Sequence, residues 1–326
     1  MTLPTTMQAA VVAAPGRLEM QVAPVPVPAP GQVLVRLEGC GVCASNIPPW
    51  EGKPWFNYPM DPGALGHEGW GRVAAVGADA AGFAPGERVA MLSGHAYAEY
   101  DLADVGSVVR LPAALDDEPF PAEPLGCALN IFARSGVERG ATVAVVGVGF
   151  LGALLIQLAV GAGARVVALA RKEPALTLAR QAGAAHVVPM DDHWRVIETV
   201  KELTGGQFCD VVIEAAGKQW PLDLAAELTR ERGRLVVAGY HQDGPRQVNM
   251  QLWNWRGLDV INAHERDPRV YLRGMEEAVA AVGSGRLDPR PLYTHRFPLA
   301  SLGEALRLSA ERPDGFMKAL VLMPTA

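Results

Sequence analysis

From about residue 121 onward, short apolar runs alternate with segments of helical periodicity. The apolar run 143–146 leads into Gly147, and apolar residues then recur at helical spacing over 154–159. Further runs that favour strands lie near Arg165, His186, Asp210, Arg234 and Asp259. A helix is expected over 124–135, before the first of these strands. Alternating strands and helices predict the α/β fold class, with a doubly wound parallel sheet.

The first 110 or so residues show a different pattern. Short β-type runs, such as 32–37 and 71–76, are interrupted throughout by glycine and proline. Residues 292–323 return to short β-type runs around one helix at 302–310. We therefore expect an all-β domain at the N-terminus and an α/β domain after it.

Composition agrees with a globular chain of two domains. The chain has 326 residues, 49% of them hydrophobic, and a net charge of -6. No basic block points to nucleic acid or to an anionic membrane surface. No apolar run reaches the roughly 18 residues of a membrane span, and the N-terminus lacks the pattern of a signal peptide. The four cysteines do not form the framework of a disulfide-rich secreted domain. These features predict a cytoplasmic protein with reduced thiols.

The strand–turn–helix at 143–159 carries the most specific motif. Gly147, Gly149 and Gly152 form a GxGxxG that encloses Phe150 and Leu151. In a dinucleotide-binding turn the glycines allow the tight turn, the approach of the pyrophosphate and close helix–strand packing. The pyrophosphate then lies at a helix N-terminus, where free N–H groups favour an anion. We therefore expect a nicotinamide cofactor here.

The end of the next strand indicates which nicotinamide cofactor is bound. An acidic residue there would bond the ribose 2'-hydroxyl of NAD, whereas an arginine accepts the 2'-phosphate of NADP. Ala170 and Arg171 occupy this place, followed by Lys172. We favour NADP(H), with NAD(H) as second choice, and the alternative is a solvated Arg–Lys pair.

Several motifs in order carry a family resemblance. They are Gly41-Val42-Cys43-Ala44-Ser45-Asn46, Gly66-His67-Glu68-Gly69, Pro85-Gly86-Glu87-Arg88-Val89, Ala98-Glu99-Tyr100, Glu123-Pro124-Leu125 and the GxGxxG. The chain resembles the zinc-dependent medium-chain dehydrogenase/reductase (alcohol dehydrogenase) superfamily, and within it the branch of polyol and threonine dehydrogenases. The match extends nearly from end to end.

The resemblance implies a domain organisation and an assembly. Residues 1–121 and 291–326 would form a GroES-like β-barrel catalytic domain, and 122–290 the Rossmann dinucleotide-binding domain. A small alcohol or carbonyl compound would be the substrate, bound between the domains. Relatives are homodimers or homotetramers.

The resemblance also implies one catalytic zinc. Cys43 and His67 match the first two ligands of the family, and a catalytic zinc needs about three protein ligands. The third ligand stays open between Glu68, Glu123 and Cys127, of which the two glutamates are favoured because free cysteine is commonly a buried residue. Cys40 is interpreted as structural. Many relatives hold a second, structural zinc in a lobe of four cysteines, but residues 89–95 here lead almost directly into 96–100, so no structural zinc is expected.

Three neighbours of Cys43 bear on proton transfer. Ser45 matches the hydroxyl that relatives use as the first proton relay, and we expect it to be catalytic together with Cys43 and His67. Asn46 stands where relatives usually have an aspartate that orients the histidine ligand. Pro48 stands where many have a relay histidine, so the proton must leave through water or another group.

Three functional hypotheses follow. The first is a zinc-dependent oxidoreductase that transfers hydride between the cofactor and an alcohol or polyol/carbonyl pair. The second is a zinc-free enzyme of the quinone-reductase kind, which retention of the ligand residues disfavours. The third is a non-catalytic nucleotide-binding relative, since fold does not determine function. His264 is a further candidate near the cofactor. Aromatic residues could line the substrate pocket or serve instead in the core or a subunit interface; they are Trp50, Trp55, Phe56, Tyr58, Trp253 and Trp255.

Overall fold

The structure is a computed structural model in which residues 3–116 and 118–324 are described. The chain divides into two compact units. The first unit comprises Met1–Gly126, Asp267–Gly283 and Tyr293–Ala326, and the second comprises Cys127–Arg266 and Ser284–Leu292. The domain boundaries suggested by the family resemblance, after residues 121 and 290, remain a prediction, because compact units need not coincide with such domains.

The second unit is built on a parallel sheet of six strands in the order β10-β9-β8-β11-β12-β13. The strands are β8 (Thr142–Val146), β9 (Arg165–Ala170), β10 (His186–Pro189), β11 (Cys209–Glu214), β12 (Thr229–Val237) and β13 (Asp259–Asn262). The strand order reverses between β8 and β11, the place where doubly wound sheets bind ligands at their carboxyl ends. The predicted doubly wound sheet is confirmed.

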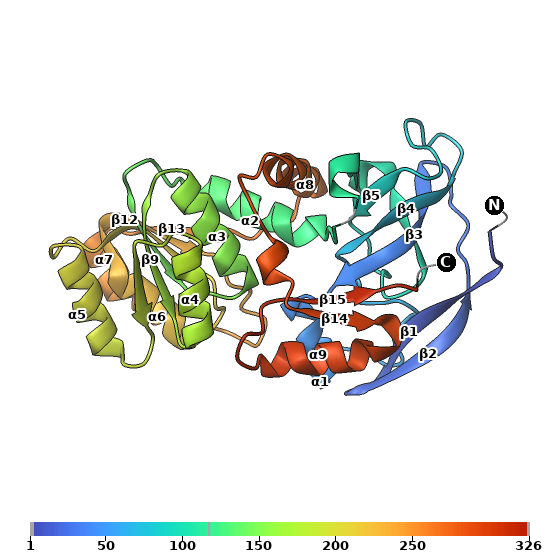
Figure 1. Cartoon of the computed structure of the whole chain (residues 1–326). Helices are drawn as coiled ribbons and strands as arrows, with labels where there is room; N and C mark the ends of the chain where they lie inside the picture. The colour runs from blue at the N-terminus through green and yellow to red at the C-terminus, as the bar shows by residue number, and fades with distance from the viewer. Residues whose placement is uncertain (1–2, 117, 325–326) are drawn as a thin grey trace. The chain divides into compact units, whose positions relative to one another are not determined.

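Helices cover this sheet (Figure 1). They are α2 (Ala122–Ser135), α3 (Phe150–Gly161), α4 (Glu173–Gln181), α5 (His193–Leu203), α6 (Gln219–Leu228) and α7 (Met250–Arg256). Helix α3 packs on β8 and β9 and touches α4, whereas α6 packs on β11 and β12 and touches α5 and α7. After their first residues, Thr142 and Arg165, strands β8 and β9 are apolar without alternation and buried, as expected of strands with both faces covered.

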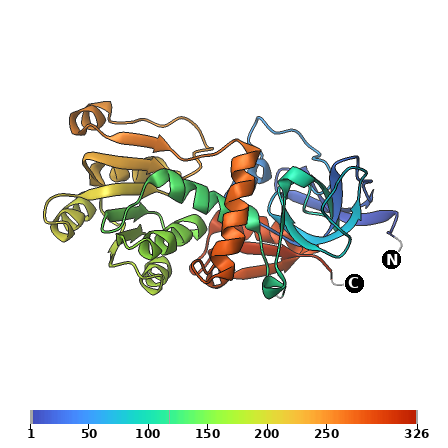
Figure 2. The ribbon, with the colours of Figure 1, turned by 90° about the horizontal axis from the view of Figure 1, so that it is seen from above.

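The first unit holds a mostly antiparallel sheet of seven strands. Its order is β14-β15-β3-β4-β5-β7, with β6 paired to β3, and β1 and β2 form a separate hairpin. The strands are β1 (Thr6–Ala14), β2 (Arg17–Pro24), β3 (Gln32–Gly41), β4 (Gly69–Val76), β5 (Arg88–Met91), β6 (Tyr100–Asp104), β7 (Val108–Arg110), β14 (His295–Pro298) and β15 (Ala319–Leu322). Residues 320–322 of β15 pair with 39–41 of β3, so the C-terminal segment, red in Figure 2, completes the N-terminal sheet.

The all-β expectation for the first 110 residues is wrong in two places, the segment after β3 and the 3-10 turn η2 (Val105–Ser107). A 3-10 helix η1 (Ala44–Asn46) and a short helix α1 (Ile47–Glu51) follow β3. Pro48 and Pro49 obscured this helix, but both stand in its first turn, where the missing N–H groups would have had no helical acceptor. Gly52, with φ of 80°, ends it.

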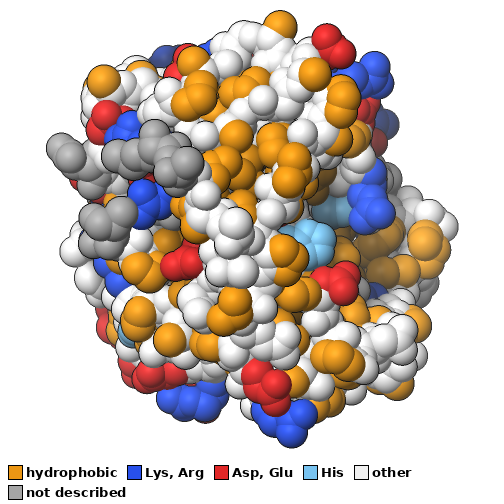
Figure 3. All heavy atoms as spheres, turned by 90° about the vertical axis from the view of Figure 1, so that its right-hand side faces the viewer, with side chains coloured by type: hydrophobic (Ala, Val, Ile, Leu, Met, Phe, Trp, Pro, Cys, Tyr) orange, Lys and Arg blue, Asp and Glu red, His pale blue; other side chains and the backbone are white. Residues whose placement is uncertain are grey.

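The remaining helices are α8 (Pro268–Gly283) and α9 (Leu302–Glu311), with 3-10 turns η2 (Val105–Ser107), η3 (Ala113–Leu115), η4 (Arg290–Leu292) and η5 (Leu299–Ser301). Across the described residues, none of the helices has both the length and the apolar character that a membrane crossing requires. On the face drawn in Figure 3, acidic and basic side chains are dispersed among hydrophobic ones, so charge of one sign is not concentrated there.

Candidate functional site

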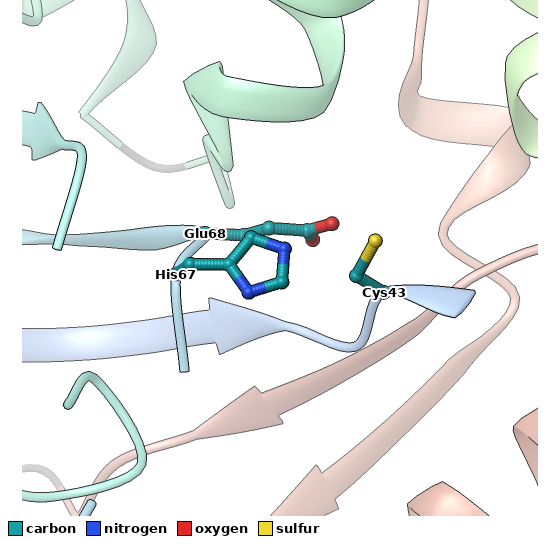
Figure 4. A group of neighbouring side chains, drawn as sticks. All are labelled: Cys43, His67 and Glu68. Carbon is teal, nitrogen blue, oxygen red and sulfur yellow. The ribbon is translucent and has the colours of Figure 1, made fainter. Parts of the chain in front are cut away.

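Three potential metal ligands meet in the first unit. One donor atom each of Cys43, His67 and Glu68 lies within 4.8 Å of the others, and the three side chains point toward a common space (Figure 4). Their convergence follows from strand pairing, because Cys40 of β3 is opposite Gly69 of β4. Cys43, just after β3, and His67 and Glu68, just before β4, therefore lie at the same end of this strand pair.

The loop before His67 determines how the imidazole is presented. Leu65 has a φ of 74°, which is unusual for a bulky residue. Its carbonyl oxygen accepts hydrogen bonds from Asn46 Nδ2 and His67 Nδ1, both at 2.9 Å. A carbonyl cannot donate, so Nδ1 carries the proton in the neutral imidazole. Nε2 is then the nitrogen available to a metal ion.

Asn46 links the loop that carries Cys43 to the loop that carries His67. Its side chain is buried, with 2% exposure, and Oδ1 accepts from the backbone N–H of Cys43 at 3.0 Å. The hydroxyl of the buried Tyr97 lies 2.8 Å from the same oxygen. Asn46 therefore acts on His67 through Leu65 rather than by direct contact, which differs from the family pattern. The sequence analysis missed Tyr97, because nothing in Ala96-Tyr97-Ala98 distinguishes it from an ordinary core residue.

The electrostatics of the group favour a cation. Burial alone would lower the pKa of His67, but the hydrogen bond and charge of Cys43, with Glu123 and Glu68, raise it to about 10. The same negative field that stabilises an imidazolium would stabilise a divalent ion. This donor set of thiolate, imidazole and carboxylate suits zinc.

Glu68 has a second partner that the sequence analysis missed. Lys318, which directly precedes β15, places Nζ 2.7 Å from Oε1 and 2.6 Å from Oε2 of Glu68. Burial on its own lowers the pKa of Lys318, but Glu68, Cys43 and Glu123 raise it above its usual value, so the ammonium stays charged. A lysine at the head of the apolar run 319–322 was the available signal, since lysine is rarely buried unless paired.

The other predicted residues are outside this set of three. Glu123 is in the first turn of α2, outside the set within 4.8 Å, although its charge reaches His67. Cys127, four residues further along α2, is half-buried and also outside that set. Ser45 is half-buried in η1. Cys40 is fully buried, and burial raises the pKa of its thiol well above the usual value.

The second unit supplies the nucleotide turn. Gly147 has a φ of 103°, and Gly149 directly precedes α3 with open space where a Cβ would stand. A Cβ on Gly152 would lie 2.0 Å from the carbonyl oxygen of Gly147. Phe150 and Leu151 open the helix, whose first turn contains no acidic residue. The open space at Gly149 and the absence of an acidic residue from the first turn suit the binding of an anion at this helix N-terminus.

The residues expected to select the cofactor stand at the end of β9. Ala170 is the last residue of the strand and is buried, and Arg171 and Lys172 are exposed before α4. Glu173, the nearest carboxylate along the chain, is engaged by Arg180 at 2.6 Å. Within the described part of the chain, Arg171 makes no hydrogen bond or ion pair, so its guanidinium is available to a ligand.

His264 follows β13 and stacks on Tyr240, with ring centroids 5.4 Å apart. Burial and the charge of Arg266 lower the pKa of His264. Trp255 is 84% exposed on α7, whereas Trp253 and Trp50 pack partly against the cores of their own units. Because Trp255 is so exposed, it is not a core residue. Among the described residues, no contact assigns Trp253 or Trp50 to a substrate site.

Two family models match the chain. An alcohol dehydrogenase GroES-like domain matches residues 29–113, and a zinc-binding dehydrogenase domain matches residues 151–279. The first match confirms the expected GroES-like architecture, and the second covers most of the parallel sheet.

Similar proteins extend over the whole chain. Sorbitol dehydrogenase of Gallus gallus is 28% identical over 97% of this chain and 97% of its own length. A protein of Sinorhizobium meliloti 1021, described as a zinc-binding dehydrogenase and bound to NADP, is 26% identical with a TM-score of 0.85, covering 98% of this chain and 100% of that one. An NAD-dependent alcohol dehydrogenase is 26% identical with a TM-score of 0.83 at the same coverage.

The ordered motifs, the two sheets and the matches from both domains agree. The chain therefore belongs to the zinc-dependent medium-chain dehydrogenase/reductase (alcohol dehydrogenase) superfamily, in its polyol branch, and is an oxidoreductase.

Proposed function

We propose that this protein is a zinc-dependent dehydrogenase that transfers hydride between an alcohol or polyol, or the matching carbonyl compound, and a nicotinamide cofactor, with NADP(H) preferred. The observation that carries the proposal is the convergence of Cys43, His67 and Glu68 within 4.8 Å. A zinc-free enzyme has no need of a thiolate, an imidazole and a carboxylate gathered at one point.

Each residue has a role in this proposal. Cys43 and His67 hold the ion, and Glu68 or Glu123 completes the set of protein ligands. Zinc, when bound, acts as a Lewis acid that makes an alcohol more acidic or polarises a carbonyl. Asn46 and Leu65 keep His67 Nε2 turned toward the ion. Ser45, half-buried in η1, is the first station of the proton relay: its hydroxyl would accept the substrate proton while passing its own proton on to water, because Pro48 cannot carry one.

The cofactor binds to the second unit. The N-terminus of α3 would hold its pyrophosphate, since Gly149 leaves open the space that a side chain would take up. Arg171 would pair with the 2'-phosphate of NADP, because its guanidinium is exposed and has no partner among the described residues. Relatives of similar identity include both an NADP-bound and an NAD-dependent protein, so the preference rests on Arg171.

The catalytic domain comprises residues 1–121 and 291–326 in this proposal, and the Rossmann domain 122–290. The chain assembles into a homodimer or homotetramer. Strand β13 supports self-association, because it is the edge of its sheet and exposes Val260 (39%) near Trp255 (84%) in the sequence. Light scattering coupled to size-exclusion chromatography measures the mass directly.

Metal analysis tests the proposal most directly. Protein purified without added metal should contain about one zinc per chain. Cys43→Ala should lose both the zinc and the dehydrogenase activity. Cys209→Ala removes a buried thiol of the second unit and should keep both, so it controls for general damage. Metal-free protein whose turnover is unchanged by Cys43→Ala would overturn the metal mechanism.

A further inference from the structure

A chain of largely buried polar side chains lies at the carboxyl end of β11. Glu214, the last residue of β11, is fully buried, and its Oε1 accepts hydrogen bonds from the backbone N–H groups of Ala216 and Gly217 at 2.8 and 2.7 Å. Its Oε2 lies 3.0 Å from Nε2 of His241, which belongs to the loop after β12. One carboxylate therefore ties the loop after β11 to the loop after β12.

Arg246 determines the role of each ring nitrogen of His241. Its Nε lies 2.8 Å from His241 Nδ1, and a guanidinium can only donate. Nδ1 is therefore the acceptor, and Nε2 carries the proton of a neutral imidazole and donates it to Glu214. The carboxylate needs this donor, because a buried charge without hydrogen bonds is costly.

The rest of the Arg246 guanidinium is engaged as well. Its Nη1 donates to the carbonyl oxygens of Gly244 and Pro245 at 3.2 and 3.3 Å. Its Nη2 donates to the carbonyl oxygen of Gly217 at 3.0 Å and to the carboxylate of Asp243. Every nitrogen of the guanidinium thus has a partner in the two loops. Arg246 therefore holds these loops and is not available to a phosphate.

The network is also balanced in charge. Besides the neutral His241 it contains two carboxylates and two cations, which are Glu214, Asp243, Lys218 and Arg246. Lys218 lies 2.6 Å from Asp243 and, with Arg246, holds the pKa of that carboxyl below its usual value. Because the charges cancel, the network does not itself attract an anion, and what it does is fix the backbone around it.

The two loops contact each other and the glycine turn. A Cβ on Gly239 would lie 2.3 Å from Gly217 N and 2.6 Å from Glu214 Oε2. A Cβ on Gly147 would lie 3.0 Å from Ala216 Cβ. The loop after β11 is therefore packed on the turn that is proposed to bind the pyrophosphate, and the loop after β12 is packed on the loop after β11.

The topology of the sheet indicates which half of the cofactor these loops face. A doubly wound sheet has two mononucleotide-binding halves, and a dinucleotide crosses between them where the strand order reverses. The residues expected to select the phosphate of the adenosine ribose follow β9, on one side of β8, whereas β11 and β12 are on the other side. The loops after β11 and β12 therefore belong to the side of the nicotinamide half.

We propose that His241 is a positioning residue which, held between Glu214 and Arg246, fixes the loop 238–249 for the nicotinamide half of the cofactor. The inference rests on the proposed cofactor site and assigns the loop that distinguishes a complete dinucleotide from its adenosine half. His241 acts through the backbone of this loop rather than by contact with the cofactor.

Two substitutions of His241 and two ligands test this role. His241→Leu removes both hydrogen bonds, whereas His241→Gln keeps an amide donor for Glu214 and a carbonyl acceptor for Arg246. The ligands are NADPH and adenosine 2',5'-bisphosphate, which lacks the nicotinamide half, and calorimetry measures both Kd values. We expect His241→Leu to raise the Kd for NADPH roughly tenfold, because a loop that is not held in place must be ordered on binding. The Kd for the bisphosphate should stay near that of the wild type, and His241→Gln should bind both ligands as the wild type does.

Two further variants separate positioning from other effects. Thr229→Val, at the opposite end of β12, loses a buried hydrogen bond to Ala225 O and should lower the Tm without changing either Kd. Arg246→Ala should repeat the selective loss of NADPH, and it covers the case in which His241→Leu does not fold. Equal weakening of both ligands in Arg246→Ala would indicate a direct phosphate contact and overturn the inference.

Failure of the inference can be told from failure of the proposed function. A wild-type protein that binds neither NADPH nor NADH refutes the cofactor site, and the inference with it. A wild type that binds NADPH, with equal losses for both ligands or no loss of either in His241→Leu, keeps the cofactor site and refutes the role of His241. If the wild type binds NADH more tightly than NADPH, NADH and ADP take the places of the two ligands.

Discussion

Gly152 and Gly147 are in such close contact that a Cβ on Gly152 would lie 2.0 Å from the carbonyl oxygen of Gly147. The obstacle is backbone, which cannot move aside as the end of a flexible side chain can. The first turn of α3 can approach the end of β8 this closely only because residue 152 has no side chain. This contact fixes the position of the N–H groups that are proposed to bind the pyrophosphate.

Gly152→Ala should therefore impair both stability and cofactor binding. The added methyl group forces the helix away from the strand, and overpacking of this kind costs about 1–3 kcal/mol of unfolding free energy. Denaturant unfolding and fluorescence titration with NADPH measure the two effects. Binding and stability equal to the wild type would contradict the close packing.

Gly149→Ala is the matched control, since a Cβ there meets nothing within 4 Å and φ is -98°. Its stability should stay near that of the wild type. Cofactor affinity should nevertheless fall, because the methyl group occupies the space above the helix N-terminus. Loss of binding without loss of stability would separate the ligand-facing glycine from the packing glycine.

Arg171→Ala tests the choice of cofactor. A hydrogen bond to a charged group contributes about 1.5–3 kcal/mol, so the Kd for NADPH should rise by roughly 10- to 100-fold. The Kd for NADH should change little, because NADH has no 2'-phosphate. Arg180→Ala, an arginine of α4 already paired with Glu173, should affect neither. Equal loss for both cofactors in Arg171→Ala would refute the phosphate contact.

Asn46→Asp tests the link between the two ligand loops. The aspartate cannot donate to Leu65 O, and it places a carboxylate oxygen against that carbonyl. We expect a loss of about 1–3 kcal/mol of stability and metal affinity lowered by roughly 10- to 100-fold. Calorimetry and chelator competition measure the two effects.

Tyr97→Phe is the milder comparison for Asn46. It removes the hydrogen bond to Asn46 Oδ1, together with the contact of the same hydroxyl with Gly41 O, and leaves the bonds of Asn46 to Cys43 N and Leu65 O in place. A cost near 1 kcal/mol is expected, with metal affinity close to that of the wild type. If Tyr97→Phe lost as much metal affinity as Asn46→Asp, the role assigned to the Leu65 carbonyl would be wrong.

The parallel sheet was predictable from sequence because its signal is local. Strands such as β8 and β9, buried on both faces, are continuous apolar runs, and the glycine turn between β8 and α3 has a fixed spacing. The short helix α1 was not predictable in this way, since two prolines usually argue against a helix unless its first turn is already located.

The candidate site was predictable only in part. Cys43, His67 and Glu68 stand within motifs, so their chemistry is visible along the chain. The position of Lys318 before the apolar run 319–322 indicated a buried, paired lysine, but its partner Glu68 is 250 residues away and is brought near only by the pairing of β15 with β3. The role of Tyr97 could not be predicted for the same reason, because its partner Asn46 is 51 residues away in the sequence.

The raised pKa of His67 makes metal binding depend on pH. In the metal-free protein that pKa is about 10, against an ordinary value of 6.5, so the imidazole is protonated at neutral pH. A metal ion must displace this proton, and affinity should rise by about tenfold for each pH unit between pH 6 and 9 for each proton released. Cobalt titrations at several pH values measure the slope.

Protonation of His67 also makes the stability of the metal-free protein depend on pH, in the direction opposite to metal affinity. A folded-state pKa above the unfolded value stabilises the fold below about pH 6.5, and this contribution disappears as pH rises toward 10. Metal-free protein should therefore lose stability on the alkaline side while metal binding gains strength. Glu123→Gln removes one of the charges that raise the pKa of His67, and it should shift both profiles toward lower pH. Metal affinity that does not vary from pH 6 to 9 would show that His67 is not protonated in the metal-free site.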